Sequence, residues 1–244
     1  MSLTAKLILS PVLVAQAIST RARLPRLPEP GGERCGVVGR GQPLQLLITG
    51  DSSAAGVGVG SQSDALAQRL SATLAAAAQA RVSWQLHARS GLTTAQTLTL
   101  LRELGQHAAD VAVVVTGVND VVDQVPTRRA LAAREALANW LRNGHGVQHV
   151  VFAPLPPIHQ FAGLPQPLRW VAGADARRHN AALAEWALSR GDVSCVDMEV
   201  PLNRGVMAAD GFHPGEPVYR YCATTIAQHI ATHVWPHLHL DTRP

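Results

Sequence analysis

The chain has 244 residues, of which 47% are hydrophobic and 16% are charged, and this composition is ample for a buried core in one large domain or two small ones. Its formal net charge of +4 arises within the first 40 residues, which hold six basic and two acidic side chains. No basic stripe with interleaved aromatic residues crosses the rest of the sequence, so the composition argues against a nucleic-acid partner. Three widely spaced cysteines, Cys35, Cys195 and Cys222, predict neither a disulfide framework nor a zinc site.

The N-terminal arm contains an apolar run from Leu7 to Ile18 that is too short to span a bilayer. Lys6 before the run and Ala15-Gln16-Ala17 near its end resemble a short secretory signal. A helix lying on a membrane surface and followed by arginines accounts for the same residues, and so does an arm that packs its Leu and Val side chains onto the domain. The sequence leaves open whether the protein is cytoplasmic, peripheral to a membrane or secreted.

Residues 20–43 are rich in Pro, Gly and Arg, with prolines at Pro25, Pro28, Pro30 and Pro43. Proline at this density interrupts regular elements, so we expect an irregular connector here. The chain is therefore expected to divide into an arm and connector over residues 1–43 and a folded domain over residues 44–244.

From Leu44 onward, short apolar runs alternate with longer segments of helical character. Unbroken apolar runs are typical of strands buried on both faces, and they predict strands at Leu44–Thr49, Val82–Ala88, Val111–Thr116, Val147–Ala153 and Val193–Val196. The segments between them are rich in good helix formers and predict helices at Asp64–Ala80, Thr94–Gly105, Thr127–Asn143, Leu168–Ser189 and Glu216–His233. This alternation predicts a doubly wound α/β fold around a parallel sheet of about five strands, whose ligands bind at the carboxyl ends of the strands.

The first predicted strand leads into the sequence Gly50-Asp51-Ser52-Ser53-Ala54-Ala55-Gly56. A serine at a strand-to-helix turn points its hydroxyl into the crevice, and its small neighbours let a substrate approach the backbone. The amide of Ser52 can also donate to a developing oxyanion. An Asp-Ser turn that caps a helix gives the same local sequence, so Ser52 is a candidate nucleophile that needs partners elsewhere.

Two further strand ends carry candidate oxyanion donors. Gly91 follows the second predicted strand and could offer its backbone amide, although a glycine at this place is more often a plain loop residue. Asn119 follows the third strand, where its side-chain amide can face developing negative charge, unless it belongs to an Asn-Asp turn. We interpret the adjacent Asp120 as a hydrogen-bond acceptor that braces the loop.

The segment Asp210-Gly211-Phe212-His213-Pro214 precedes the last predicted helix. A short turn can fold the Asp210 carboxylate onto one ring nitrogen of His213, which fixes the tautomer and leaves the other nitrogen to accept a proton from a serine. Asp210 and His213 are therefore the candidate partners of the nucleophile.

These four segments, in this chain order, resemble the signature blocks of the SGNH hydrolases, also called GDSL esterases and lipases. The resemblance covers Leu44 to the last helix and implies a three-layer α/β/α, flavodoxin-like fold. It also implies hydrolysis of carboxylic esters or thioesters without metal or cofactor. The sequence departs from the family at Ser53, where Leu is usual, so a second hydroxyl stands beside Ser52.

The same resemblance assigns roles to the residues that match the blocks. It implies Ser52 as the nucleophile, with Asp210 and His213 as its acid and base partners. It implies that the oxyanion hole is formed by Ser52, Gly91 and Asn119.

The resemblance does not fix the substrate, since members of the family act on lipids, acyl-thioesters and acetylated sugars. We expect a small-molecule acyl ester that contacts Val118, Phe161 and Phe212, with Pro154–Trp170 as a wall of the acyl pocket. The alternatives are a carbohydrate deacetylase and a catalytically inactive protein of the same fold that binds or scaffolds. The glycine run Gly56 to Gly60 lacks the pattern of a phosphate cradle. The C-terminal histidines have no carboxylate among them and predict no metal site; they are His229, His233, His237 and His239.

Overall fold

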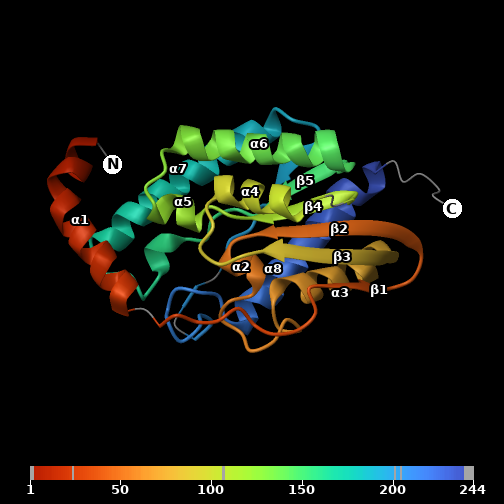
Figure 1. The fold of residues 1–244 in the computed structure, drawn as a ribbon, viewed down its shortest axis with the longest axis horizontal. Coiled ribbons are helices and arrows are strands. Elements are labelled where there is room, and N and C mark those ends of the chain that lie inside the picture. The colour runs from red at the N-terminus through yellow and green to blue at the C-terminus, as the bar shows by residue number, and fades with distance from the viewer. Residues whose placement is uncertain (1–2, 24, 106–107, 201, 204, 239–244) are drawn as a thin grey trace.

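The computed structural model describes residues 3–23, 25–105, 108–200, 202–203 and 205–238. A six-stranded sheet with the order β1-β3-β2-β4-β5-β6 forms its centre (Figure 1). The strands are β1 (Cys35–Val38), β2 (Gln42–Gly50), β3 (Ala80–Ala88), β4 (Val111–Val115), β5 (His149–Phe152) and β6 (Val193–Cys195). The α-helices are α1 (Leu3–Arg23), α2 (Ser52–Ala55), α3 (Leu66–Ala78), α4 (Thr94–Leu104), α5 (Val118–Val122), α6 (Thr127–His145), α7 (Leu168–Leu188) and α8 (Glu216–His229).

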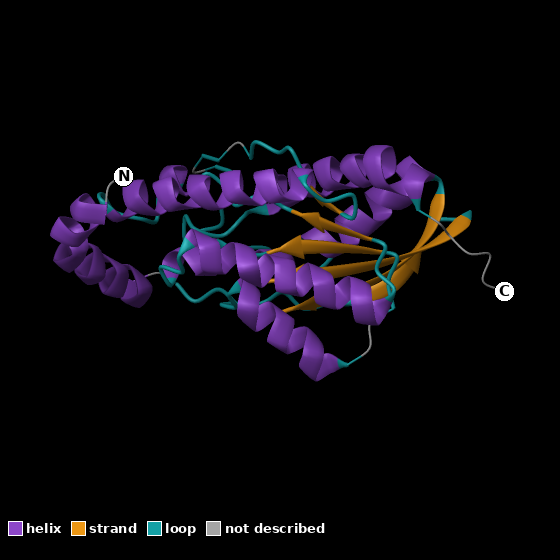
Figure 2. Ribbon diagram, turned by 90° about the horizontal axis from the view of Figure 1, so that it is seen from above, coloured by secondary structure: helices purple, strands orange, loops and turns teal. Residues whose placement is uncertain are grey.

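Helices cover both faces of the sheet, and Figure 2 shows the twisted strands between them. Helices α3 and α8 pack together on one face, and α4, α6 and α7 on the other. Strands β2 to β6 pair in parallel in the order β3-β2-β4-β5-β6, which is the flavodoxin-like order with its switch point between β2 and β4. The predicted three-layer, flavodoxin-like α/β/α fold is confirmed.

The central strands are apolar along their whole length because each of their faces meets a helical layer. Ile48 and Val113 belong to the core cluster with α3 and α8, whereas Leu47 and Val114 belong to the cluster with α4, α6 and α7. All four side chains are fully buried. The unbroken apolar runs therefore mark strands that are buried on both faces.

Two regions differ from the prediction: the expected irregular connector over residues 20–43, into which α1 extends as far as Arg23, and the end of the last helix. The strand β1 lies inside the expected irregular connector and pairs antiparallel with β3 at the edge of the sheet. This strand is only four residues long, and its side chains alternate between exposed and half-buried, so it lacks the apolar run of a central strand. The last helix was expected to continue to His233, but α8 ends at His229 and a π-helical segment, Ile230–Val234, follows.

Helix α1 stands at the end of the domain toward which the arrowheads of β2 and β3 point (Figure 1). The Gln16 side chain donates to the backbone oxygen of Gln166 at 2.5 Å and accepts from the backbone N–H of Leu168 at 3.0 Å. Apolar side chains on α1 are exposed; they are Val12 at 47%, Val14 at 57% and Ile18 at 66%. Thus the polar side chain of Gln16 attaches α1 to the domain, whereas several apolar side chains of α1 face solvent. Contact of these residues with a membrane surface stays a prediction.

Among the helices that the structure describes, α1 included, none combines the length and apolar character needed to cross a bilayer. Within the same residues, no group of three or more His, Cys, Asp or Glu side chains is arranged to hold a metal ion. His239 lies outside the described part of the chain.

The amino end of β5 holds a histidine that should make folding stability depend on pH. The His149 and His229 rings lie 3.0 and 2.8 Å from the Ser194 hydroxyl. Burial, and after it the neighbouring His229, lowers the pKa of His149 from 6.5 to about 4. Because the unfolded chain binds this proton near pH 6.5, the stabilisation present above pH 6.5 is lost as the pH falls toward 4. We expect this loss to be roughly 2 kcal/mol after allowance for partial solvent exposure.

Urea unfolding of the wild type and of His149→Gln at pH 7 and pH 4.5 measures this effect. Glutamine can still bond Ser194 but does not titrate, so the wild type should lose more free energy of unfolding than the variant. Burial also raises the pKa of Asp51 to about 7, which gives the opposite pH slope, but this contribution is common to both proteins and cancels in the difference. Equal losses in the two proteins would show that His149 does not carry the effect.

Candidate active site

Ser52 begins a short helix directly after the central strand. Gly50 at the end of β2 has a φ of +150°, and a Cβ added to it would lie 1.9 Å from the backbone oxygen of Val115. Only glycine lets β2 and β4 approach so closely. Asp51 caps α2 because its Oδ1 accepts from the Ser53 N–H at 3.0 Å. The turn that caps a helix is thus present, and it places Ser52 at the switch point of the sheet.

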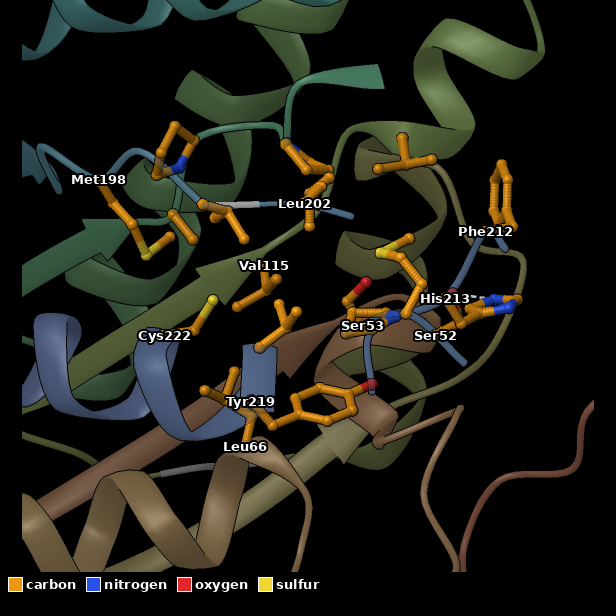
Figure 3. Close-up of a pocket in the computed structure, with 18 of the residues that line it drawn as sticks. Ser52, Ser53, Leu66, Val115, Met198, Leu202, Phe212, His213, Tyr219 and Cys222 are labelled. Carbon is orange, nitrogen blue, oxygen red and sulfur yellow. Dashed lines mark hydrogen bonds between the residues drawn. The ribbon is translucent and has the colours of Figure 1, made fainter. Parts of the chain in front are cut away.

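The predicted nucleophile, base and acid lie in one hydrogen-bonded row. His213 Nε2 is 3.1 Å from the Ser52 hydroxyl oxygen, and His213 Nδ1 is 2.6 Å from Asp210 Oδ2. Ser52 and His213 are 161 positions apart in the sequence, and their side chains lie within hydrogen-bonding distance (Figure 3). This is the order of groups by which a carboxylate orients an imidazole and the imidazole takes a proton from serine.

The Asp210 carboxylate is held in its ionised form. Its side chain is 1% exposed, and Oδ1 accepts from the backbone N–H groups of Phe212 and His213, both at 2.9 Å. Burial alone would raise the pKa of Asp210, but the bonds from the His213 ring and from these two amides lower it below its ordinary value. A negative charge therefore faces His213 Nδ1 at neutral pH, which favours the tautomer with its free lone pair on Nε2.

The two other predicted oxyanion donors lie on neighbouring loops. The Asn119 side-chain amide donates to the backbone oxygen of Leu92 at 3.0 Å, which ties the loop after β4 to the loop after β3. Only one N–H of a primary amide is needed for that bond, and the second can serve another acceptor. Gly91 is exposed, with a φ of +84°. Within the residues that the structure describes, no acceptor engages the Gly91 N–H.

Asp120 braces the loops, as expected from the sequence. Its two carboxylate oxygens accept from the backbone N–H of Thr94 at 3.0 Å and from the Thr94 hydroxyl at 2.5 Å. The buried Arg134 guanidinium lies 3.9 Å from the same carboxylate and against Gly117. This buried ion pair supports the turn that carries Asn119, and the sequence alone gave no indication of Arg134.

Ser52 and His213 help to line an apolar pocket, which holds about 700 Å³ of empty space when the adjoining open solvent is included. One side is α8, through Val218, Tyr219, Cys222 and Ile226. The Tyr219 hydroxyl donates to the backbone oxygen of Val57 at 2.7 Å, so its polar end is occupied. Burial raises the pKa of the Cys222 thiol to about 12, so this group is uncharged. Figure 3 shows the Ser53 hydroxyl turned into this cavity while Ser52 faces His213.

The three predicted substrate-contacting residues, Val118, Phe161 and Phe212, all line this cavity. Phe161 and Phe212 meet edge to face, with ring centroids 5.2 Å apart. Of the segment Pro154–Trp170, which was expected to form a wall of the acyl pocket, the first half lines this cavity through Pro154, Pro156 and Phe161. Trp170 is 48% exposed on α7, and Leu164 instead lines a groove against α1.

Sequence reasoning missed the wall formed by α8. Val218, Cys222 and Ile226 recur every four residues and so lie on one helix face. That periodicity was available, but it is the same for a helix that packs on a solid core and for one that borders a cavity. Met198, Val200 and Leu202, which line the cavity from an irregular segment, carry no pattern that singles them out.

The sequence matches a known protein family. The model of the GDSL-like lipase/acylhydrolase family matches residues 48–221, a span that includes Ser52 and His213. Among curated proteins, the chain has no match.

Several solved structures share the fold. A lipase from a goat rumen metagenome is 20% identical, with a TM-score of 0.62 over 78% of this chain and 98% of that one. A lipolytic protein of the G-D-S-L family from Veillonella parvula is 14% identical, with a TM-score of 0.59 over 77% of this chain and 98% of that one. The psychrotrophic esterase EstA from Pseudoalteromonas sp. is 16% identical, with a TM-score of 0.55 over 75% of this chain and 92% of that one. The family match spans well over half of the sequence and includes Ser52, Asp210 and His213. The chain therefore belongs to the GDSL-like lipase/acylhydrolase family.

Proposed function

We propose that the protein is a serine hydrolase of small acyl esters that works through an acyl-enzyme. The observation that carries this proposal is the Ser52–His213–Asp210 row, whose Ser52 and His213 line an apolar cavity. His213, the side chain that accepts the proton of Ser52, thus lies next to an apolar surface that can bind an acyl chain.

In the first half of the reaction, the Ser52 oxygen attacks the acyl carbon while its proton passes to His213 Nε2. The carbonyl π electrons move onto the oxygen, and the resulting oxyanion is held by the amides of Ser52 and Gly91 and by the Asn119 side chain. Collapse of this intermediate breaks the bond to the alcohol, which leaves with the proton from His213. In the second half, water attacks the acyl-enzyme while it gives a proton to His213; the bond from the acyl carbon to the Ser52 oxygen then breaks, His213 returns the proton to that oxygen, and the carboxylic acid leaves.

The lining of the cavity favours an unbranched acyl chain over an acetyl group on a polar sugar. Its walls are formed largely by aliphatic, aromatic and sulfur-containing side chains on α8, at the end of β4, and on the segments that follow β4, β5 and β6. Burying one methylene there contributes about 0.8 kcal/mol, so each added carbon can raise kcat/KM up to roughly fourfold until the cavity is filled. An oxygen ester and a thioester place the same acyl chain in this cavity.

Cys222→Phe should shorten the preferred chain because the added ring fills the cavity beside α8. With a series of aryl esters from acetate to palmitate, we expect the wild type to prefer a chain longer than acetate. The variant should lose about tenfold or more in kcat/KM on the preferred ester and keep its turnover of acetate.

The matched control is Cys35→Phe, because Cys35 is exposed on the edge strand β1 and its replacement should leave the series unchanged. If acetate were the best ester of the wild type, the deacetylase alternative would gain support. An identical optimum in Cys222→Phe would show that the chain does not enter this cavity.

A further inference from the structure

The connector between α1 and β1 contacts the loop that carries Gly91. It passes from α1 along one side of the domain to β1 (Figure 1). Glu29 of this connector accepts two hydrogen bonds on Oε1, from the Ser90 N–H at 2.7 Å and from the Ser90 hydroxyl at 2.8 Å. Glu29 lies before the residues matched by the family model, which start at 48.

Arg34 fixes the Glu29 carboxylate in this position. Its guanidinium donates from Nη1 to Glu29 Oε2 at 3.0 Å and from Nη2 to the backbone oxygen of Ala88 at 2.5 Å. Burial alone would raise the pKa of Glu29, but the bonds from Ser90 and Arg34 lower it below its ordinary value. The carboxylate is therefore ionised at neutral pH, and charge-assisted bonds of this kind are stronger than neutral ones.

Gly91 makes few contacts itself, so the direction of its N–H depends on the residues on either side of it. It is exposed, and a Cβ added to it would find no heavy atom within 4 Å. Its φ of +84° lies in the region that glycine adopts freely. The residue before it is held by Glu29, and the carbonyl of the residue after it, Leu92, accepts from Asn119 at 3.0 Å. The loop is thus clamped on both sides of the proposed oxyanion donor.

We propose that Glu29 is a positioning residue for the oxyanion hole: by holding Ser90, it directs the N–H of Gly91 toward the oxygen of the tetrahedral intermediate. The inference rests on the proposed function, because it needs Gly91 to donate to that oxygen. In this role, Glu29 touches neither substrate nor Ser52. Its effect on catalysis is exerted through the backbone of the Ser90–Gly91 loop.

The role predicts a loss in kcat with little change in KM. A donor that is missing altogether costs about 10²–10³-fold in kcat, and one that is only loosened should cost less, so we expect about a tenfold fall in Glu29→Ala. Glu29→Gln keeps an oxygen that can accept from Ser90, so it should recover most of kcat. Glu33→Ala is the matched control, because Glu33 is exposed on the same connector.

Affinity for an aryl boronic acid separates positioning from a general loss of structure. The boronate adduct on a catalytic serine is tetrahedral and places an oxygen in the oxyanion hole, so it depends on Gly91 as the transition state does. In Glu29→Ala, its inhibition constant should rise by the same factor by which kcat/KM falls, while the melting temperature stays close to that of Glu33→Ala. Ser90→Ala removes one of the two bonds, so it should show a smaller loss, and the double variant should lose less than the product of the two single losses.

Two outcomes would overturn the inference alone. In the first, the wild type is active, and Glu29→Ala has the same kcat and boronate affinity. In the second, Glu29→Ala has a higher KM but an unchanged boronate affinity. A wild type that neither hydrolyses aryl esters nor reacts with a fluorophosphonate would overturn the proposed function, and the inference with it.

Discussion

Replacing Ser52 with alanine is expected to lower the turnover of an activated aryl ester by roughly 10⁴- to 10⁶-fold. The variant has no hydroxyl to attack the acyl carbon, so an acyl-enzyme cannot form, and only the oxyanion hole and substrate binding can still assist water. Ser52 is 9% exposed and starts the short helix α2, whose cap comes from Asp51. The truncation should therefore leave the melting temperature nearly unchanged. Steady-state hydrolysis of the preferred aryl ester measures the loss.

Ser53→Ala is the matched control, because it removes an adjacent hydroxyl and keeps the hydrogen bond from the Ser53 N–H to Asp51. The Ser53 side chain lines the cavity, whereas His213 bonds to Ser52. We expect Ser53→Ala to stay within about tenfold of the wild type. A reversed result, with Ser53→Ala inactive and Ser52→Ala active, would move the nucleophile to the second hydroxyl.

Asp210→Asn is expected to lower kcat by about 10⁴-fold with little effect on KM. Asp210 accepts from His213 Nδ1 at 2.6 Å, and an uncharged amide in its place neither fixes the tautomer nor stabilises the imidazolium that forms when Ser52 gives up its proton. Since the pKa of Asp210 is lowered, this carboxylate should not be the group whose protonation limits the wild type near neutral pH. Initial rates at saturating ester between pH 5 and pH 9 measure both effects.

Asp197→Asn is the control for the second prediction, because Asp197 is exposed and lies outside the hydrogen-bonded row. It should leave kcat unchanged. Activity of a well-folded Asp210→Asn within tenfold of the wild type would mean that His213 works without this partner.

The parallel part of the fold can be predicted from sequence because burial on both faces removes polar residues from whole strands. The runs around Ile48, Val113 and Val151 lie where the structure has β2, β4 and β5. The edge strand β1 has the opposite character, since it is four residues long, half-exposed and set among glycines and prolines. Its place depends on pairing with β3, which lies more than 40 residues further along the chain, and local pattern does not carry that information.

The candidate site also has parts that the sequence indicates and parts that only the folded structure shows. Ser52, Asp210 and His213 are singled out by the resemblance of four segments to the SGNH blocks, and the structure brings them into one hydrogen-bonded row. The bond between Glu29 and Ser90 joins residues 61 positions apart, and the cavity depends on how α8 lies against the ends of the strands. Both are products of tertiary packing, and a single sequence shows neither the contact nor the empty space.

The proposed reaction depends on the activation of Ser52 by His213 for attack on an acyl carbon. Incubation with a fluorophosphonate, followed by peptide mass spectrometry, tests it directly, because only an activated serine forms the phosphonyl ester. We expect one phosphonyl group on Ser52, and none in His213→Ala under the same conditions. A protein that hydrolyses esters yet carries the label on Ser53 or on no serine would contradict this expectation.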